Sequence, residues 1–480
     1  MRVMLPQTVT AEHICGATAT LREAPQAAIL SAMPPPMALS KTKLQSYAQC
    51  PRRVWLETYN PELEEPSADK SVWLDAGRTL DTIARQLYGR DGGHTVSFDR
   101  GLRAAIDTTR ALLAAGGTTP IFEATFDHEG VSVRVDVLDR SAAEPRLIEV
   151  KSGAHVREHH LDDCAIQAWA LTGVGLPPRQ IVVATLDTAF VYPGDGRYEG
   201  LLVEHDVTDT VRERLANVAQ LVVGARTTLA DIDEPTTPVG KQCRAPHPCE
   251  FYGHCAPKAA PPPPRGTPKI GAELRDFARA LPYPRYYLDF ETIGYGVPEF
   301  AGTRPYEALP FQWSCHIETA PRELRHAEFL DTSGTPPMRA VAETLVAALG
   351  TAGPILVYTN FERRVLDSLA NRYPDLAGPL NAAIARLVDL HPPTKQHYDH
   401  AALNGSWSLK AVLPTVAPDL DYAKLGEVQD GLAAQRAYTQ ASAPNTPAAR
   451  RDSLRRALLD YCRQDTLALV RLVEFFSRAA

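Results

Sequence analysis

The chain has 480 residues, more than one hydrophobic core normally supports, so two or three domains are expected. An apolar fraction of 44% and a charged fraction of 22% are typical of globular proteins and exclude a chain that is disordered throughout. The net charge of −7 excludes a global basic field, so contact with nucleic acid would need local basic patches or bound cations.

Two further compositional features narrow the class of protein. The sequence has no run of about twenty apolar residues and no charged leader with an apolar core, so we expect a cytoplasmic protein without a membrane partner. Eight cysteines are too few for a disulfide scaffold in a chain this long, and a metal or cluster site is the better expectation.

The first expected elements are a tail and two helices. Residues 1–36, rich in Ala, Pro and Thr, predict a disordered tail, and Met37 is the candidate native start. Ser40 can cap a helix that ends at the Cys50–Pro51 step. A second amphipathic helix is expected over residues 72–88.

Strand signals and helix signals then alternate through both halves of the chain. In the first half, strands are expected at 121–140, 146–153 and, as a pair, 181–194, with helices at 159–175 and 209–225. The second half repeats the alternation, with strands at 285–294, 310–318, 327–332 and 386–390, a strand running into a helix at 354–370, and helices at 338–350, 406–416 and 454–476. This interleaving predicts an α/β fold in both halves.

A proline-rich stretch separates the two halves. Residues 258–271 predict a stiff, extended linker. The expected domains are therefore residues 37–257 and residues 272–480.

Carboxylates recur on three consecutive strand segments of the first half. They are Glu123, Asp136 and Glu149, and Lys151 shares a strand face with Glu149 because side chains alternate. Converging carboxylates repel one another unless a divalent cation neutralises them, and Mg²⁺ prefers oxygen ligands. Such a cation activates a bound water, which Lys151 is placed to orient or deprotonate. An exposed hairpin with an ordinary ion pair is the alternative.

These residues form a motif with a glutamine on the next helix: an acid, then Glu-x-Lys, then Gln167. The motif resembles the RecB-like PD-(D/E)xK nucleases, in the iron–sulfur branch of CRISPR-associated and AddB-type enzymes. The resemblance implies a restriction-endonuclease-like fold whose acids bind Mg²⁺ or Mn²⁺, with the lysine serving the water and the glutamine supporting the site. Where this family often has a histidine ligand in an early helix, the chain has Asp81.

Four cysteines bracket this motif. Cys50 precedes it, and Cys243, Cys249 and Cys255 follow it at regular spacing. Four thiolates suit either an iron–sulfur cluster or zinc. The resemblance implies a 4Fe–4S cluster, because the family places one cysteine ligand before the core and three after it; Zn²⁺ is the alternative.

The second half carries another set of acids. Asp289 and Glu291 share a strand face, Glu362 lies at a strand-to-helix junction, and Tyr461 and Asp465 are one helical turn apart. Two cations about 4 Å apart would need this many acids. Asp367 and Asp389 are rivals of Glu362 for the third acid.

The order and spacing of these residues resemble the DEDD exonucleases of the ribonuclease H-like fold, in the subclass that carries a tyrosine. The resemblance implies that Asp289, Glu291, Glu362 and Asp465 bind metal and that Tyr461 orients the attacking water. His159, His160, His316 and His326 are expected to be solvated or packed histidines rather than ligands.

Together these features predict a metal-dependent nuclease, an exonuclease acting on DNA (single-stranded or at ends) or alternatively on RNA, in repair, recombination or defence. A RecB-like half followed by a DEDD-like half resembles an uncharacterised bacterial family of predicted nucleases. The sequence has no GxxxxGK[ST] loop, so a helicase motor would be a separate chain. The alternatives are a non-catalytic nucleic-acid-binding scaffold with a structural cluster, and a zinc-stapled domain with an RNA-processing role.

Overall fold

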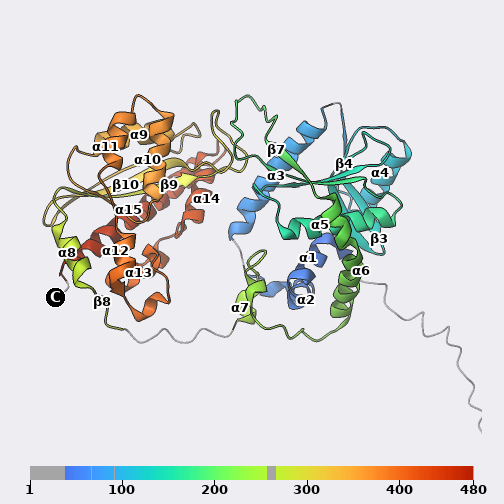
Figure 1. Cartoon of the computed structure of the whole chain (residues 1–480), viewed down its shortest axis with the longest axis horizontal. Helices are drawn as coiled ribbons and strands as arrows, with labels where there is room; N and C mark the ends of the chain where they lie inside the picture. The colour runs from blue at the N-terminus through green and yellow to red at the C-terminus, as the bar shows by residue number, and fades with distance from the viewer. Residues whose placement is uncertain (1–37, 66–67, 91, 257–265, 479–480) are drawn as a thin grey trace, which may run out of the picture.

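The computed structural model describes residues 38–65, 68–90, 92–256 and 266–478, with the side chains of residues 68–76 left out (Figure 1). The predictions for residues 1–36, for Met37 and for residues 258–265 of the linker therefore lie outside the described residues. The fold is α/β with mixed sheets, as predicted. None of the helices in the described ranges is long and apolar enough to span a membrane.

A seven-stranded sheet organises residues 38–256, here called the first lobe. Its strand order is β2-β3-β4-β5-β6-β7, and β1 pairs with β4. The strands are β1 (Leu39–Ser40), β2 (His94–Thr95), β3 (Ile121–His128), β4 (Val131–Asp139), β5 (Arg146–Lys151), β6 (Gln180–Leu186) and β7 (Leu202–Asp206). The helices are α1 (Lys41–Gln49), α2 (Pro51–Tyr59), α3 (Ala68–Tyr88), α4 (Leu102–Ala114), α5 (Glu158–Gly173), α6 (Thr208–Ala230) and α7 (Tyr252–Cys255).

The alternation of side chains along β5 divides the first lobe into two cores. Ile148 and Val150 pack with Leu80 and Ile83 of α3 on one face of the sheet. Leu147 packs on the opposite face with residues of α5 and α6. Because Glu149 and Lys151 alternate with Ile148 and Val150, their side chains lie on the α5 face.

A five-stranded sheet organises residues 266–478, here called the second lobe, in the order β11-β10-β9-β12-β13. Strands β9, β10 and β11 are antiparallel, and β12 and β13 run parallel to β9. The strands are β9 (Arg285–Ile293), β10 (Leu309–Ala320), β11 (Glu323–Leu330), β12 (Ile355–Val357) and β13 (Leu387–Asp389). A further pair joins β8 (Lys269–Ile270) to β14 (Tyr398–Asp399).

Helices cover this second sheet, and the longest of them, α15, contacts β9, β10 and α14. The helices are α8 (Ala272–Ala280), α9 (Met338–Ala348), α10 (Phe361–Arg372), α11 (Ala377–Ile384), α12 (His391–His397), α13 (Leu409–Val416), α14 (Gly431–Ser442) and α15 (Ala448–Arg478). Helix α14 was not predicted: its buried side chains are mostly alanines, which give a weak apolar stripe.

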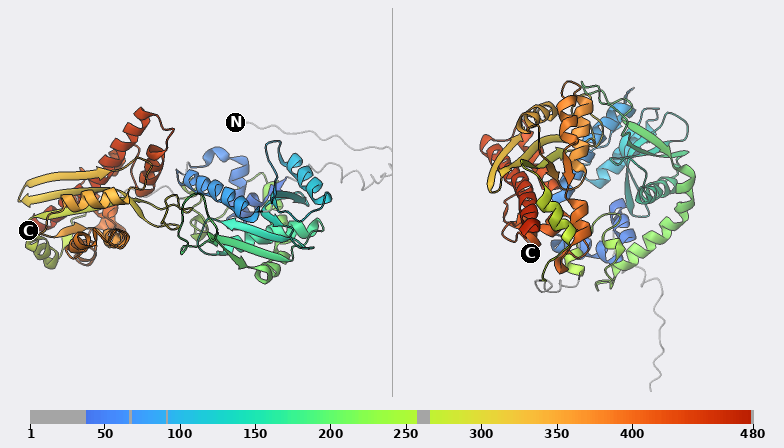
Figure 2. Two further views of the ribbon diagram at one scale, coloured as in Figure 1. Left: turned by 90° about the horizontal axis from the view of Figure 1, so that it is seen from above. Right: turned by 60° about the vertical axis from the view of Figure 1, so that its left-hand side comes forward.

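The two lobes lie side by side and meet through two loops and through a contact of α14 with α3 (Figure 2). Tyr192 exchanges backbone hydrogen bonds with the second lobe: its N–H donates to the Thr303 carbonyl (2.9 Å), and Gly302 N–H donates to the Tyr192 carbonyl (2.7 Å). Tyr198 Oη donates to the Pro298 carbonyl (3.1 Å). Val297 is 8% exposed and belongs to the same core cluster as Val150. The loop that follows β9 therefore contributes to the core on the α3 face of the first sheet.

The predicted strand pair at residues 181–194 is wrong in its second half. Strand β6 ends at Leu186, and its antiparallel partner is β7, after a loop in which Asp195 has a φ of +57°. The apolar and aromatic residues that suggested a strand are those of the interlobe contact. Apolar residues that contact another lobe have no periodicity in the sequence that would distinguish them from a buried strand.

Candidate active sites

Strand β5 presents the first acidic site to helix α5. Glu149 is 2% exposed, and its Oε1 accepts a hydrogen bond from Lys151 Nζ (2.6 Å) while its Oε2 accepts one from Gln167 Nε2 (2.6 Å). Asp136 on β4 accepts from Val150 N–H through Oδ2 (2.8 Å). The structure thus brings together Asp136, Glu149, Lys151 and Gln167.

Sequence reasoning missed two members of this first site. Asp163, on α5 and 1% exposed, accepts from Lys151 Nζ through Oδ2 (2.5 Å). Lys41, at the start of α1, lies 2.9 Å from Asp163 Oδ1 and 3.2 Å from Glu149 Oε1. Asp163 had a signal, since it lies four residues before Gln167 and so on the same helix face. Lys41 is 108 residues from Glu149, and nothing local marks it.

Burial and mutual charge set the protonation of this first site. Burial, with Asp136 and Asp163 nearby, raises the pKa of Glu149 to about 7. Burial also raises the pKa of Asp136. Burial acts in the same direction on Asp163, but Lys41 and Lys151 outweigh it and lower the pKa of that carboxyl. Burial opposes the charge on Lys151, yet Glu149 and Asp163 raise its pKa well above the ordinary value, so this lysine is cationic at neutral pH.

Glu123 lies at the margin of the first site. It has a φ of +58°, in the left-handed region that a non-glycine residue rarely adopts, and such strain gathers at functional sites. Its carboxylate pairs with Arg134 (2.8 Å) and Arg85 (3.2 Å) rather than with the lysines. Burial and Glu123 raise the pKa of Asp81, so Asp81 lies near this margin too.

The four predicted cysteines line one pocket. Cys50 lies between α1 and α2, Cys243 follows Lys241 and Gln242 in a 3-10 turn, and Cys249 and Cys255 bracket Phe251. The pocket wall is otherwise apolar and basic, with Leu56, Phe251, Arg52 and Arg53. Gln49 Nε2 donates to the carbonyls of Gln242 (2.7 Å) and His247 (2.8 Å), which ties the cysteine loop to the end of α1.

The four pocket sulfurs do not form a compact ligand group. Among the described residues, one group of three His, Cys, Asp or Glu ligand atoms lies mutually within 4.8 Å, and it is Asp289, Glu291 and Cys462. No three of the four pocket sulfurs are therefore that close together. A tetrahedral zinc with Zn–S bonds of about 2.3 Å would hold every sulfur pair about 3.8 Å apart.

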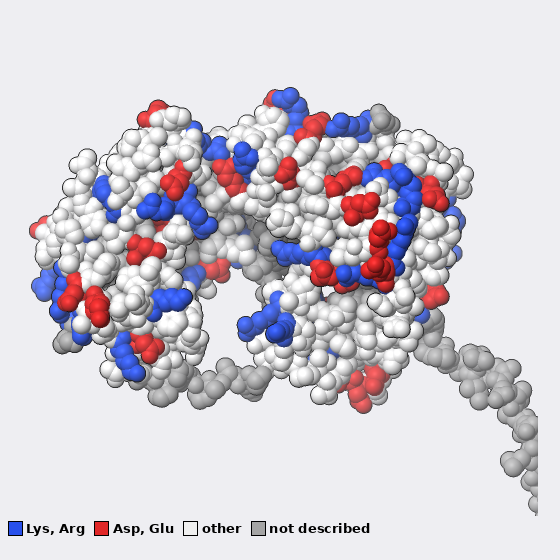
Figure 3. All heavy atoms as spheres, in the orientation of Figure 1, with Lys and Arg blue, Asp and Glu red and all other residues white. Residues whose placement is uncertain are grey.

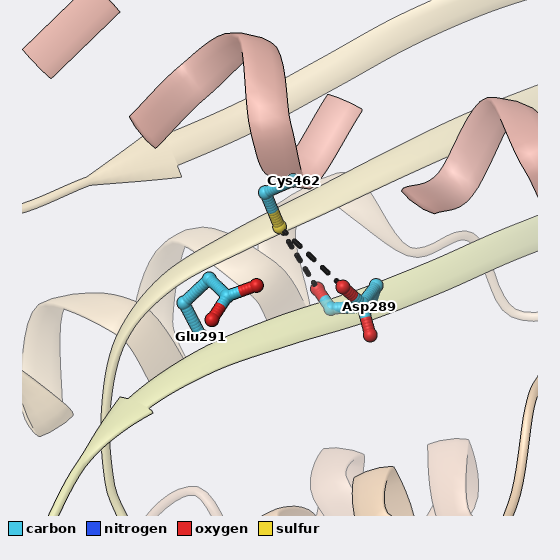
Figure 4. Close-up of side chains that lie close together, drawn as sticks. All are labelled: Asp289, Glu291 and Cys462. Carbon is cyan, nitrogen blue, oxygen red and sulfur yellow. Dashed lines mark hydrogen bonds between the residues drawn. The ribbon is translucent and has the colours of Figure 1, made fainter. Parts of the chain in front are cut away.

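The second acidic site lies between β9 and α15. Asp289 and Glu291 project from β9 toward Cys462 on α15 (Figure 4). The Cys462 thiol donates weakly to Asp289 Oδ2, with an S···O distance of 3.8 Å. Burial and the surrounding acids raise the pKa of Cys462 well above its usual range, so it is a neutral thiol.

Glu362 and Asp465 complete this second acidic set. Asp465, on α15, is 8% exposed and accepts a hydrogen bond from Tyr422 Oη. Glu362, at the start of α10, is 3% exposed; its carboxyl group shares a hydrogen bond with Asp289, and its Oε2 has no partner among the described residues. Tyr461 lies one turn before Asp465. Burial and the negative charge of Asp465 raise the pKa of Tyr461.

The rivals for the third acid differ in position. Asp367 is exposed on α10 and lies outside the buried set. Asp389 Oδ1 accepts from the N–H groups of Thr359 (2.8 Å) and His391 (2.9 Å), which fixes the turn before α10. Thr359 has a φ of +90°, a strained conformation for a β-branched residue. Asp389 therefore shapes the turn that delivers Glu362.

Positive charge is scarce around the second acidic site. Burial, Asp465, Glu291 and Glu362 together raise the pKa of Asp289 well above its ordinary value. Burial and Asp465 do the same to Glu291, with Lys410 acting against them. Lys410 Nζ lies 5.3 Å from the Tyr461 ring and donates to the Gln429 carbonyl (3.0 Å). Lys410, Tyr422 and Cys462 are members of this site that the sequence did not indicate.

Two histidines near this site have packing roles. His316 Nδ1 lies 2.8 Å from Thr466 Oγ1, and His326 Nε2 lies 2.8 Å from Ser314 Oγ. Burial lowers the pKa of His316 to about 3 and that of His326 to about 4. Both are neutral, hydrogen-bonded rings between β10, β11 and α15.

Glu362→Gln should stabilise the cation-free protein increasingly as pH rises. Burial raises the pKa of Glu362 from its ordinary 4.5 to about 8. The folded state therefore holds this proton more tightly than the unfolded state, and stability falls between these two pH values by about 1.4 kcal/mol per pH unit. Thermal unfolding in chelator from pH 5 to pH 9 measures the difference between variant and wild type.

Asp367→Asn is the matched control for this prediction, because Asp367 lies exposed on the same helix. The difference in unfolding temperature between Asp367→Asn and wild type should stay constant across the same pH range. A flat difference for Glu362→Gln as well would show that Glu362 is ionised normally in the folded protein.

The comparisons with known proteins give a family for part of the second lobe. Residues 286–408 match a family described as "Domain of unknown function (DUF2779)". This range contains Asp289, Glu291 and Glu362 and ends before Tyr461 and Asp465. No curated protein matches the chain.

Among solved structures, a chain described as "Crystal structure of SSO0001" matches at 16% sequence identity. The match covers 49% of this chain and 93% of that chain, with a TM-score of 0.24. A score this low carries no argument about the fold.

Proposed function

We propose that the chain is a metal-dependent nuclease that hydrolyses phosphodiester bonds of DNA, or alternatively of RNA. The observation that carries the proposal is the convergence of four carboxyl groups in the second lobe, from β9, α10 and α15, of which three are buried and that of Asp289 is half-buried. Lys410 opposes the rise in pKa of Glu291 and Asp465, and Arg364 opposes that of Glu362. Buried carboxylates that raise one another's pKa are destabilising on their own, so a site of this kind is kept for a cation.

The donor set fits Mg²⁺ or Mn²⁺. Asp289, Glu291, Glu362 and Asp465 supply oxygen ligands, and the unpartnered Oε2 of Glu362 is a free acceptor. When bound there, divalent cations stabilise charge on the phosphoryl oxygens and lower the pKa of a bound water. In this chain Tyr461 would position that water, and Tyr422 holds Asp465 in place through its hydrogen bond.

The strand order supports a ribonuclease H-like assignment of the second lobe. Three antiparallel strands followed by two parallel ones, in the order β11-β10-β9-β12-β13, place the acids of β9 at the centre of the sheet. The long helix α15 crosses beside β9 and returns Asp465 to it. We therefore propose a DEDD-type exonuclease site here.

The first lobe would supply a second nuclease site of the PD-(D/E)xK type. Asp136 and Glu149 would hold the cation, and Gln167 orients Glu149. Of the two roles that the sequence left open for Lys151, the structure favours orientation of water, since a lysine held cationic by Glu149 and Asp163 is a poor base. The four pocket cysteines would hold a 4Fe–4S cluster, as the resemblance implies, with Zn²⁺ as the alternative.

The charge distribution fits a substrate bound by local features. On the face shown in Figure 3, basic and acidic side chains of the described residues are interspersed. On this face the nucleic-acid contact would therefore depend on the sites themselves more than on a broad basic surface.

Cleavage assays on four proteins test the proposal. Wild type, Lys151→Ala, Asp289→Ala and the double variant should be incubated with Mg²⁺ or Mn²⁺ on single- and double-stranded DNA and RNA. We expect wild type to cleave, and the double variant to lose at least about 10²-fold, since even groups that support a metal ligand contribute 10–100-fold. A wild type that is inert on every substrate would support the scaffold alternative.

A further inference from the structure

Lys41 is held in the first acidic site by the fold around it. Leu39 and Ser40 form β1, which pairs in parallel with Val131 and Ser132 of β4, the strand that carries Asp136. Leu39 is 1% exposed, and Ser40 Oγ accepts from the N–H of Lys43 (3.2 Å) to cap α1. The first residue of α1 is therefore fixed against the site by a strand pair and a helix cap.

The position of Lys41 is unfavourable for helix α1 itself. The first turn of a helix carries partial positive charge, so an acid is favoured there and a cation is disfavoured. No acid occurs in the first turn of α1. What compensates Lys41 comes from other elements, Glu149 on β5 and Asp163 on α5. This choice of residue is explained by the site and not by the helix.

The two lysines and two acids form an alternating ring. Glu149 Oε1 receives both ammonium groups, from Lys151 at 2.6 Å and Lys41 at 3.2 Å. Asp163 takes one lysine on each oxygen, Lys41 on Oδ1 at 2.9 Å and Lys151 on Oδ2 at 2.5 Å. Asp163 therefore spaces the two ammonium groups as a pair.

The lysine side chains are more exposed to solvent than the acidic side chains. The side chains of Glu149 and Asp163 are each 2% exposed, whereas those of Lys41 and Lys151 are 19% and 23% exposed. An ammonium group has three donors. Lys151 uses two of them on Glu149 and Asp163, and Lys41 uses one on Glu149 and forms an ion pair with Asp163. The exposed part of the ring therefore belongs to the two lysine side chains, each with a donor to spare.

We propose that Lys41 and Lys151 together bind a backbone phosphate of the nucleic-acid substrate, with Asp163 as the positioning residue that holds them as a pair. A phosphodiester has two non-bridging oxygens, and two spaced ammonium groups match them as donors. The inference rests on the proposed nuclease function for its ligand, and it adds a substrate contact that the Glu-x-Lys motif does not contain.

Salt-dependent binding tests the proposal apart from catalysis. The probe is a labelled single-stranded DNA oligonucleotide in chelator, where no metal-dependent cleavage occurs, with fluorescence anisotropy read across a salt series. Each phosphate contact by a lysine contributes about 0.7 to the slope of log affinity against log salt on a single strand. We expect Lys41→Met to lower the slope by about that amount, and Lys41→Arg to retain it.

Two further variants separate a phosphate contact from a change in net charge or folding. Lys43→Met removes a lysine from the same helix and should keep the wild-type slope. The double variant Lys41→Met/Asp163→Asn has the wild-type net charge. It leaves fewer unpaired buried charges than Lys41→Met, so it replaces that variant if the latter fails to fold. Its salt slope should fall by the same amount as that of Lys41→Met. Wild-type slopes in both Lys41→Met proteins would overturn the proposal.

The outcome is also distinct from that of the cleavage assays. A wild type that cleaves while the Lys41 variants bind as wild type would overturn this inference and leave the nuclease proposal standing. A slope that falls in Lys41→Met with an inert wild type would show phosphate binding by the lysine pair without catalysis.

Discussion

Asp289→Asn should remove most of the thermal stabilisation that Mn²⁺ gives the second lobe. Asp289 lies within 4.8 Å of ligand atoms of Glu291 and Cys462, and Glu291, Glu362 and Asp465 all raise its pKa after burial. A cation that binds the folded state alone stabilises it by about 2.7 kcal/mol at a concentration of 100 Kd, which corresponds to roughly 5–10 °C for a unit of this size.

The same substitution should act in the opposite direction when the cation is removed. Asparagine keeps the shape of aspartate but takes one carboxylate out of a buried, mutually repelling set. In chelator at pH 8 the variant should therefore unfold at a higher temperature than wild type. A variant that is more stable than wild type in chelator and is no longer stabilised by Mn²⁺ is the result expected for a cation site.

Two variants make this first experiment specific. Asp367→Asn, on the exposed face of α10, should retain both the metal-free stability and the full Mn²⁺ shift. Asp136→Asn tests whether the first lobe contributes to the shift. If Asp289→Asn retains the whole shift and Asp136→Asn loses it, the second acidic site is not the one that binds the cation.

The residues that could be predicted from the sequence are those whose signal is local. Glu149 and Lys151 alternate with apolar residues along one strand, and Asp289 and Glu291 do the same on another, so period-two reasoning placed each pair on one face. The α/β class followed in the same way, because strands and helices alternate along both halves.

The residues that escaped prediction depend on contacts distant in sequence. Lys41 is hydrogen-bonded to Glu149 across 108 residues, and Tyr422, in a short 3-10 helix, is hydrogen-bonded to Asp465 across 43 residues. The interlobe loop around Tyr192 was read as a strand because its apolar side chains face the other lobe. Only their proximity in the folded protein marks these residues as members of a site or of an interlobe contact. The spacing of residues in a single sequence does not predict such proximity.

Helix α1 links two of the proposed sites through one short element. Lys41 at its first residue contacts Glu149 and Asp163, while Gln49 at its last residue holds the loop of Cys243 and Cys249, and Cys50 follows directly. Nine residues of helix span about 12 Å at 1.5 Å per residue. The cysteine pocket and the lysine pair are therefore joined by one short helix.

Cys50→Ser should cause the largest loss of stability among single substitutions in the first lobe. A group bound by Cys50 and Cys243 closes a loop of about 190 residues, and cross-linking a loop of that length restricts the unfolded chain by about 5 kcal/mol. We expect a brown wild-type protein with broad visible absorption, iron and sulfide by chemical analysis, and a colourless, less stable Cys50→Ser variant.

Cys164→Ser is the matched control, because Cys164 is buried on α5, outside the pocket. It should keep the colour and the iron content. A colourless wild type with stoichiometric zinc would contradict the cluster, and it would require the pocket sulfurs to close to the roughly 3.8 Å spacing of a tetrahedral zinc site.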